Sequence, residues 1–575
     1  MSFTRRTRRE LDAVRVPAKC IDVELTEPLK DIHATAYRSL HVLVRLHGEP
    51  IGIVAPPLVD GQCSASTLTA LILDTLAPSI VRAATRRSLD APLDRMPLDA
   101  DRLADRLARP PVDRAGPLSG VTVVVCTCGR PEKLQGCLDA IRRLDHPDVE
   151  VVVVDNAPAR GGAELVARAH PAGARYIHEP APGLDRARNR GIMAATRDII
   201  AFTDDDARVD RGWASAIARL LDASPEVHAV TGLVMPLELE TEPQLQFERY
   251  LGFGRGFERR WWEAPEPCGR SIALRYGNTG RFGTGANMAF RRSALAIVGG
   301  FDPALDAGTL TQGGGDLDMF FRIIKARGTI VYEPAALVRH EHRRDIQELE
   351  AQLSTWGTAM RSYAERTRLN HPEERLPFAI LVHWLLATWH LRRLLWSLVD
   401  RNASTRLVVA EIVGLAGGRE RYGRSRVVAE EVARRFGPSV PPPRVTHRAN
   451  RTGTHDPRNV AEHVVDLATP IGPFTQPGTA NTVRLAITFE GRPVATTSLA
   501  HCGRTVSAVR LRDVIARCAG PQICGRPIGV RLHGGAERAL AEGIVTSLQE
   551  RAETTGRRAG RSKKRGRQSH EPASQ

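Results

Sequence analysis

The sequence has no uninterrupted apolar run long enough to cross a bilayer as a helix. Its most apolar helical stretch, residues 378–391, contains His383 and His390 and is followed by two arginines. About 20 apolar residues are needed to span a membrane, so this stretch falls short. Two interpretations stay open: a buried or amphipathic helix of the central region, or a helix lying on the cytoplasmic membrane surface, which its tryptophans and arginines would suit.

Cysteine motifs and a secretion signal are also missing. The first ten residues are basic but lead into charged sequence rather than an apolar core, so no signal peptide is expected. The nine cysteines are scattered, and the pairs Cys126/Cys128 and Cys518/Cys524 have no partner pair at zinc-site spacing. We therefore expect free thiols, no structural zinc and a cytoplasmic protein.

Acidic residues are outnumbered by basic ones, 65 to 81, which gives a formal net charge of +16. Part of the excess lies in residues 551–575, whose composition predicts a disordered basic tail. Such a tail suits nucleic acid or anionic lipid, but a solvated tail is the simpler interpretation, and nucleic acid is not expected as a partner. The remaining excess agrees with phosphate-bearing substrates.

The length of 575 residues is too great for one ordinary core, and Pro- and Gly-rich linkers at 109–120 and 437–443 divide the chain. The expected parts are an N-terminal module (1–115), a central domain (119–345), a helical extension (346–437), a C-terminal module (470–550) and the basic tail (551–575).

The two terminal modules share a pattern. Residues 41–54 and 483–496 each indicate two short strands around a Gly-x-Pro turn, and helical stretches follow at 66–76 and 506–518. We interpret this as a weak internal duplication, with chance similarity of two hairpins as the alternative. The modules are expected to pair, either with each other or between chains.

Apolar strands alternate with helices in the central domain. This alternation predicts a largely parallel α/β sheet with ligands at the carboxyl ends of its strands. Expected strands are 121–126, 149–154, 174–177 and 199–203, and expected helices are 132–144, 163–169 and 185–196.

Polar residues follow the first two strands. Residues 127–131 open a helix with Pro131 in its first turn, and free amides at a helix N-terminus suit the phosphates of a nucleotide. The second strand ends in Asp155-Asn156, which in isolation is more often a capping pair than a ligand site.

The fourth strand ends in three consecutive carboxylates, Asp204-Asp205-Asp206. Adjacent like charges repel, so a cation among them is the natural explanation. Mg²⁺ and Mn²⁺ prefer hard oxygen ligands and bridge to substrate phosphates. The sequence therefore predicts a metal–diphosphate site at this edge of the sheet.

Taken together, these segments resemble the family-2 glycosyltransferases of the GT-A fold. The resemblance covers residues 121–344, and its specificity comes from the order and spacing of the segments. It implies an α/β fold class: a GT-A nucleotide-diphospho-sugar transferase fold with a helical C-terminal extension and small flanking α+β modules. The segments that carry it are 126–132, 154–156, 183–191, 202–206, 283–291, 299–302, 315–318 and 339–343.

The resemblance implies an inverting transfer of a sugar from a nucleotide-diphosphate donor to an acceptor hydroxyl, with Mn²⁺ or Mg²⁺ as cofactor. Thr127 and Asp155 would hold the base and ribose of the donor, and Asp205 is a candidate ribose contact. The implied donor-binding residues are Thr127, Arg130, Asp155, Arg188, Asn189, Asp204 and Asp205. The implied metal ligands are Asp204, Asp206 and His340, with His342 as the alternative to His340.

Asp316 matches the acid that such enzymes use as general base, which takes the proton of the attacking hydroxyl. This sequence departs from the commonest pattern, in which an acid precedes that Asp, because position 315 is Gly. Asp318 is a competitor, although its offset matches a second, structural acid. The glycines at 313–315 suggest a mobile loop, and Asn287 with Asp318 completes the acceptor or loop candidates.

Two other motifs are missing. No Gln-x-x-Arg-Trp follows Asp318, and no membrane pore segments follow, so a single transfer is expected rather than polymerisation. A nucleotidyltransferase is an alternative, but residues 127–131 lack its Gly-rich basic loop. A non-catalytic nucleotide-sugar-binding scaffold is another, suggested by Gly315 and the flanking modules. The acceptor stays open between a glycan, a lipid-linked molecule and a small molecule, and so does peripheral contact with the inner face of the cell membrane.

Overall fold

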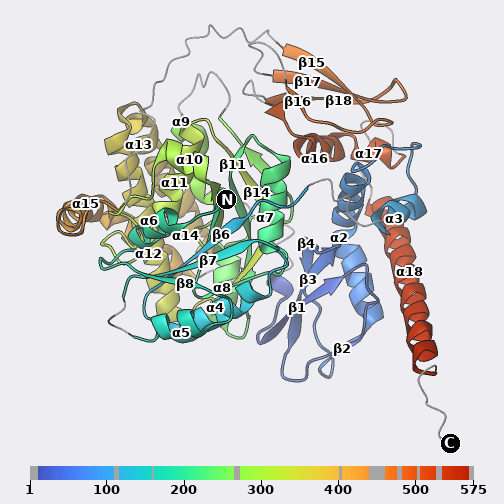
Figure 1. Ribbon diagram of the computed structural model, residues 1–575, viewed down its shortest axis with the longest axis horizontal. Coiled ribbons are helices and arrows are strands. Elements are labelled where there is room, and N and C mark those ends of the chain that lie inside the picture. The colour runs from blue at the N-terminus through green and yellow to red at the C-terminus, as the bar shows by residue number, and fades with distance from the viewer. Residues whose placement is uncertain are drawn as a thin grey trace, which may run out of the picture.

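The structure is a computed structural model that describes residues 11–108, 116–157, 159, 161–264, 272–399, 404–439, 460–475, 482–500, 505–525 and 534–568. The central domain lies between the helical extension on one side and the two terminal modules on the other (Figure 1). Of the linkers, residues 109–115 and 440–443 fall outside the described ranges.

One nine-stranded mixed sheet forms the middle of the central domain, in the order β10-β14-β11-β13-β9-β6-β7-β8, with β12 paired to β14. Strands β9, β6, β7 and β8 are parallel, as the sequence predicts, and β13 inserts antiparallel between β9 and β11. The strands are β6 (Val121–Thr127), β7 (Val149–Asp155), β8 (Arg175–His178), β9 (Ile199–Asp204), β10 (Ala207–Val209), β11 (Val227–Pro236), β12 (Arg260–Trp262), β13 (Asn287–Arg291) and β14 (Thr329–His340).

Helices cover both faces of this sheet. Val123 and Val125 of β6 pack on one side with α4, α5 and α7, whereas Val124 and Cys126 pack on the other with α6, α10 and α11. This confirms the α/β fold class. The helices are α4 (Pro131–Arg142), α5 (Ala163–Ala169), α6 (Leu184–Ala194), α7 (Trp213–Ala223), α8 (Glu242–Tyr250), α9 (Ile272–Tyr276), η2 (Thr279–Arg281), α10 (Arg292–Val298) and α11 (Gly315–Lys325).

The extension after β14 is helical. Long helices α12 and α15 touch closely because Gly357, Gly414 and Gly418 stand where a side chain would meet the backbone of the other helix. Thr358 donates to the carbonyl of Gly414 at 3.1 Å, which ties the pair together. The elements are α12 (Ile346–Asn370), η3 (Pro372–Glu374), α13 (Arg375–Trp384), η4 (Leu385–His390), α14 (Leu391–Ser397) and α15 (Thr405–Phe436).

The terminal modules have the same strand arrangement. In each module a three-stranded sheet has a parallel pair, β1/β3 or β15/β17, and an antiparallel hairpin, β3/β4 or β17/β18. A separate two-stranded ribbon, β2/β5 or β16/β19, precedes a helix. The N-terminal elements are β1 (Ala18–Glu24), β2 (Ile32–His33), β3 (Ser39–Leu46), β4 (Glu49–Val54), β5 (Gln62–Cys63), α2 (Ala65–Ser88) and α3 (Ala100–Ala108). The C-terminal elements are β15 (Val460–Asp466), β16 (Phe474–Thr475), β17 (Thr482–Phe489), β18 (Arg492–Ala500), β19 (Thr505–Val506), α16 (Ala508–Cys518), α17 (Gly520–Ile523) and α18 (Gly534–Gln568).

A carboxylate closes the hairpin in both modules. Glu24 accepts hydrogen bonds from the amides of His47 and Gly48, and Asp466 accepts them from Glu490 and its following glycine. Both turns have positive φ at their two central residues, 53° and 77° in the first, 50° and 76° in the second. The similarity therefore extends from strand order to the hydrogen bonds that fix the turn.

The two modules bury their apolar faces in one shared core, so they pair within the chain. Leu68 and Ile72 of α2 pack in the same cluster as Leu511 and Ile544 of the C-terminal module. Within the described ranges, α2 is the one helix with the length and composition to cross a bilayer, and it contributes to this core.

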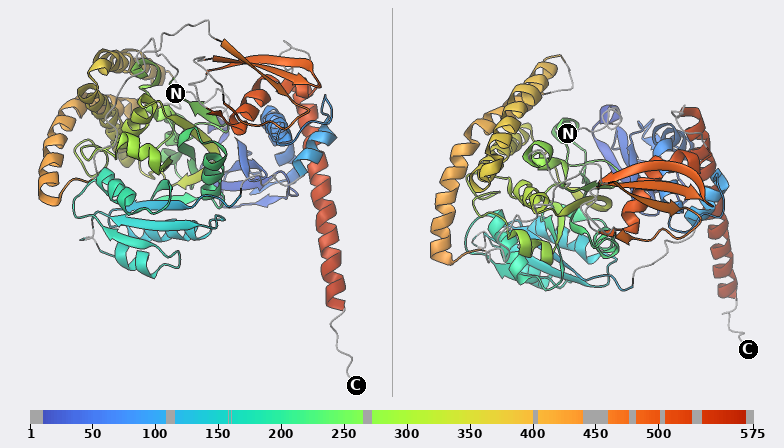
Figure 2. Two further views of the ribbon diagram at one scale, coloured as in Figure 1. Left: turned by 45° about the horizontal axis from the view of Figure 1, so that its top comes forward. Right: turned by 90° about the horizontal axis from the view of Figure 1, so that it is seen from above.

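Helix α18 runs beside the N-terminal module (Figure 2). It continues to Gln568, so the tail predicted to be disordered from residue 551 is helical up to that point. Residues 569–575 lie outside the described residues.

Candidate active site

The polar residues predicted at the strand ends meet at one edge of the sheet. In the β6/β9 pair Cys126 lies opposite Asp204, and in the β6/β7 pair Thr127 lies opposite Asp155. Parallel strands place their carboxyl ends side by side, so three distant segments of sequence converge.

Asp204, Asp206 and His340 form a cluster with the geometry of a metal site. One ligand atom from each lies within 4.8 Å of the others. Nε2 of His340 is 3.3 Å from Oδ1 of Asp206, and its buried Nδ1 has no hydrogen-bond partner among the described residues. Carboxylate and imidazole ligands suit Mn²⁺ and accept Mg²⁺, so the donor set fits the predicted ion.

The two carboxylates of this cluster have pKa values shifted in opposite directions. Burial and the neighbouring Asp206 raise the pKa of Asp204. Against burial, His340 and Arg130 hold the pKa of Asp206 well below its ordinary range, and Asp206 raises the pKa of His340. Asp206 is thus the more firmly ionised carboxylate, as expected for a direct ligand.

Asp205 points away from the cluster. Its carboxylate accepts a hydrogen bond from Oγ1 of Thr127 at 2.7 Å and is paired with Arg130, which also reaches Asp206 at 3.1 Å. The side chain is buried, and burial raises its pKa to about 6. Asp205 therefore fixes Thr127 and Arg130 at the site rather than facing open space.

Arg188 is paired with two acidic side chains beside the metal cluster. Its guanidinium donates to Asp185 at 2.9 Å and to Asp306 at 2.5 Å. Both Arg188 and Asp204 line the same cavity. These two ion pairs fix the position of the Arg188 guanidinium beside the cavity.

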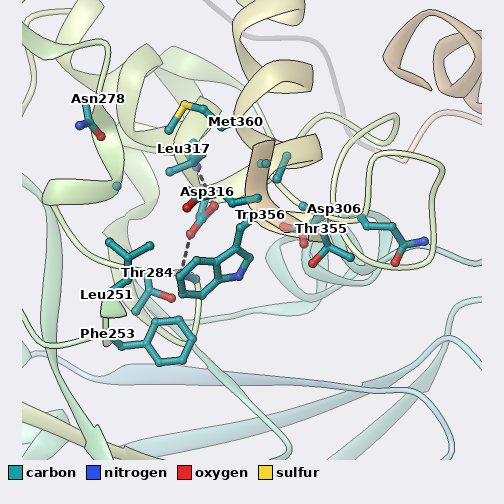
Figure 3. A pocket seen from close by; sticks show the side chains of 18 of the residues that line it. Leu251, Phe253, Asn278, Thr284, Asp306, Asp316, Leu317, Thr355, Trp356 and Met360 are labelled. Carbon is teal, nitrogen blue, oxygen red and sulfur yellow. Dashed lines mark hydrogen bonds between the residues drawn. The ribbon is translucent and has the colours of Figure 1, made fainter. Parts of the chain in front are cut away.

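That cavity has a volume of about 290 Å³ and also receives the side chain of Asp316. Asp316 accepts hydrogen bonds from the amides of Gly285 and Leu317, both at 2.8 Å (Figure 3). Burial, reinforced by the neighbouring Asp306 carboxylate, raises the pKa of Asp316 to about 6. A carboxylate held in this way can accept a proton near neutral pH.

Asp318 is placed differently. It is fully buried, two residues further along α11, and forms ion pairs with Arg322 at 2.7 Å and Arg366 at 2.6 Å. It does not line the cavity. The geometry therefore separates the two candidate bases into a cavity-facing acid and an acid that joins α11 to α12.

The glycines before Asp316 have a packing role. Gly314 has φ of 102°, and a side chain there would meet the carbonyl of Ala359 on α12. At position 315 a side chain would overlap the carboxylate of Asp185. Close approach between helices accounts for both glycines without invoking mobility.

Three further predicted residues make structural contacts and do not line the cavity. Asn189 is buried and exchanges hydrogen bonds with the backbone of Phe301. Asn287 bonds Trp213 and the carbonyls of two strands. His342 is paired with Glu248 at 2.7 Å, which leaves His340 as the cluster histidine.

Aromatic and aliphatic side chains form the other side of the cavity. Trp356 and Met360 come from α12, whereas Trp384 and Trp389 come from the segment formed by α13 and η4. Phe253 packs edge-on against His340 at 5.1 Å between ring centroids, and it also contacts Trp356. This apolar wall therefore reaches the metal cluster.

Several of these residues were not identified from the sequence. Asp185 precedes Arg188 by three positions in a helix, a spacing that favours an ion pair and could have indicated it. Asp306 and Trp356 carry no motif, because their role depends on how a loop and α12 fold onto the sheet.

Comparison with known sequences agrees with this geometry. Residues 122–298 match the profile of Glycosyl transferase family 2. The pre-mycofactocin glycosyltransferase of Mycobacterium tuberculosis is 29% identical over 312 residues, which are 53% of this chain and 59% of the relative. The succinoglycan biosynthesis protein ExoM of Rhizobium meliloti is 28% identical over 228 residues, 38% of this chain and 66% of the relative. The chain thus spans about three fifths to two thirds of these curated relatives.

Solved structures give weaker similarities. The mannosyltransferase PcManGT from Pyrobaculum calidifontis, in complex with GDP-Man and Mn²⁺, has a TM-score of 0.36 at 18% identity, covering 61% of this chain and 97% of that one. Glucosyl-3-phosphoglycerate synthase from Mycobacterium tuberculosis has a TM-score of 0.30 at 18% identity, with 47% and 88% covered.

The sequence profile covers the strands that carry Thr127, Asp155 and the three consecutive carboxylates, and it ends before α11. Over residues 122–298, the central domain therefore matches glycosyltransferase family 2.

Proposed function

We propose that this protein is an inverting glycosyltransferase that moves a sugar from a nucleotide-diphosphate donor to an acceptor hydroxyl and depends on a divalent metal. One observation carries the proposal: Asp204 of the metal cluster and Asp316 open on the same cavity, with Arg188 beside both. A family-2 glycosyltransferase segment forms the donor side of that cavity.

In the proposed reaction, the acceptor oxygen forms a bond to the anomeric carbon while the bond from that carbon to the diphosphate oxygen breaks. The proton of the hydroxyl passes to a carboxylate oxygen of Asp316. A single displacement inverts the configuration at the anomeric carbon. Arg188, held by Asp185 and Asp306, would orient the diphosphate by charge-assisted hydrogen bonds.

The Mn²⁺ or Mg²⁺ ion would be held by Asp204, Asp206 and His340. When bound, it would stabilise the negative charge that develops on the leaving diphosphate. Thr127 and Asp155 would lie on the nucleoside side of the donor. Asp155 is nearly fully buried and accepts from the amide of Ala157 and the hydroxyl of Tyr176, so its orientation is fixed.

The test is to incubate the full chain with Mn²⁺ and a panel of UDP- and GDP-sugars and to measure thermal stabilisation and slow donor hydrolysis. Binding to the folded state raises the melting temperature, and the stabilisation grows with the logarithm of ligand concentration over Kd. We expect a nucleoside diphosphate and a sugar as products, with the sugar released as the inverted anomer in proton NMR spectra recorded before mutarotation.

Asp204→Asn should abolish both responses, whereas Asp101→Asn, at an exposed position of α3 in the N-terminal module, should match the unmutated protein. In a parallel incubation with a nucleoside triphosphate and a sugar 1-phosphate, release of pyrophosphate would indicate a nucleotidyltransferase instead. Donor binding without any turnover, with or without acceptors, would favour a non-catalytic scaffold.

A further inference from the structure

One face of helices α13 and α14 exposes large apolar side chains. They recur mostly at helical spacing, so they form a stripe along the surface. Leu395 and Trp396 are 57% and 62% exposed. We call this stripe the apolar ridge, and its defining members are Leu376, Ile380, Leu391, Leu395, Trp396 and Val399.

The ridge is not the face by which these helices join the domain. Phe378 and Val382, on the opposite side of α13, pack against Tyr363 and Phe321 in a buried cluster. Further along, Leu385 and His390 are buried while their neighbours are exposed. These helices are therefore apolar on both faces, which is unusual for a helix that meets only water on one side.

The charged side chains of residues 376–399 are all basic. Residues 376–399 contain two arginines and no aspartate or glutamate. Arg392 is exposed, whereas Arg393 turns inward and lies 3.6 Å above the ring of Tyr250. An apolar stripe with tryptophan and arginine at its margin matches the layered polarity of a lipid interface, in which basic side chains meet anionic headgroups.

The ridge is continuous with the cavity. Trp384, Leu385, Trp389 and His390 belong to the same helical segment and line the cavity on its inner side. Trp384 is also 46% exposed, so the indole lies at the boundary between cavity and surface. The segment is part of the helical extension, on the side of the central domain away from the terminal modules (Figure 1).

We propose that the apolar ridge docks the protein on the surface of a bilayer that contains anionic lipid, with the cavity mouth beside the membrane. A second copy is a poorer occupant, because the same surface on a second chain would offer no acidic residue from 376–399 to pair with Arg392. That docking serves a membrane-borne acceptor rests on the proposed function, whereas docking itself is measured without any donor.

The test is co-sedimentation of the full chain with vesicles of phosphatidylcholine alone and of an equimolar mixture with phosphatidylglycerol. We expect binding to the anionic vesicles, weakened by salt. The double variant Leu395→Glu/Trp396→Glu should bind at least about tenfold less, since two charges would enter the interface. The matched control is Val427→Glu/Val428→Glu on α15, where side chains are 61% and 52% exposed but lie outside the ridge.

A second measurement distinguishes a loss of membrane binding from misfolding of the double variant. Brominated phosphatidylcholine, mixed with phosphatidylglycerol, should quench the tryptophan fluorescence of the unmutated chain. Trp396→Phe should reduce that quenching while circular dichroism and donor hydrolysis in solution stay unchanged.

No binding to anionic vesicles, or equal binding by both double variants, would overturn the proposal. Loss of a dimer in light scattering for the ridge variant, without vesicle binding, would assign the ridge to a second copy. Because donor hydrolysis is scored separately, an inactive protein that still docks would refute only the proposed function.

Discussion

The carboxylate of Asp185, on α6, occupies the space that a side chain at position 315, on α11, would fill. The family resemblance led us to expect an acid at this position, directly before the proposed base Asp316, but the residue is Gly. Here the acidic group comes from a neighbouring helix. It lies at the N-terminal end of α11, where the helix dipole favours negative charge, and its Oδ1 is paired with Arg188.

This relationship predicts that substitutions at positions 315 and 185 partly compensate for each other. Gly315→Glu alone should abolish turnover and destabilise the protein by about 3 kcal/mol or more, because it overpacks the site and adds a charge beside a buried carboxylate. Asp185→Gly alone should lower turnover, since Arg188 keeps only Asp306. The double variant should recover part of both losses, as measured by kcat and by urea denaturation.

Recovery in the double variant is the informative outcome, because a purely additive loss would show that the two positions do not share one space. Gly308→Glu is a control, since it also introduces an acid at a tightly packed glycine, here against the backbone of Gly183, but has no carboxylate beside it. Removal of Asp185 should not rescue that variant.

Asp316→Asn should reduce sugar transfer by about 10²- to 10⁴-fold, the range expected when a general base is lost, while donor binding in the presence of Mn²⁺ stays within about twofold. The reason is that Asp316 lines the cavity but does not belong to the metal cluster. Single-turnover kinetics and titration calorimetry measure the two effects. Intact transfer by this variant would refute the base assignment.

Asp318→Asn should act on stability instead. Its carboxylate is buried between Arg322 and Arg366, and breaking a buried ion pair leaves an uncompensated charge that costs about 3–5 kcal/mol. Denaturant unfolding should show this loss. At a temperature where the variant is still folded, its kcat should be near that of the unmutated chain, and a large fall in kcat without a change in stability would reverse the two roles.

The pH dependence of transfer follows from the pKa of Asp316, which burial raises to about 6. Protonated Asp316 cannot accept the proton of the acceptor, so log kcat should rise with unit slope below about pH 6 and level off above it. A pH–rate profile with saturating donor and metal measures this. Asp316→Asn should remove the inflection, and a profile that stays flat well below pH 6 would contradict the assignment.

Removal of the metal should abolish transfer, and Mn²⁺ or Mg²⁺ should restore it. His340→Ala should weaken Mn²⁺ binding by roughly tenfold or more, because it removes one of three clustered ligands. His342→Ala is the matched control: its imidazole is 2.7 Å from Glu248, so it should affect stability more than metal affinity. Calorimetric titration of Mn²⁺ in the presence of nucleoside diphosphate distinguishes the two.

Much of the donor side could be predicted from the sequence because its residues follow apolar strands directly. A buried strand fixes where its last residue emerges, so Thr127, Asp155 and Asp204 had to lie near one sheet edge once the strands were recognised as parallel. The same argument could not separate His340 from His342, since His340 ends β14 and His342 lies only two residues further along the chain. Their different partners, Asp206 and Glu248, decide that question.

By itself, the sequence determined the α/β class of the central domain, its family resemblance and the metal-binding carboxylates, because strand periodicity and consecutive charges are local properties of the chain. Only the tertiary structure decided that Asp316 faces the cavity while Asp318 is paired with two arginines, that Asp185 takes the place beside Gly315, and that Trp356 and Trp384 line the cavity. Those outcomes depend on how α6, α11, α12 and α13 pack. Such packing brings together residues more than 60 positions apart that share no pattern in the sequence.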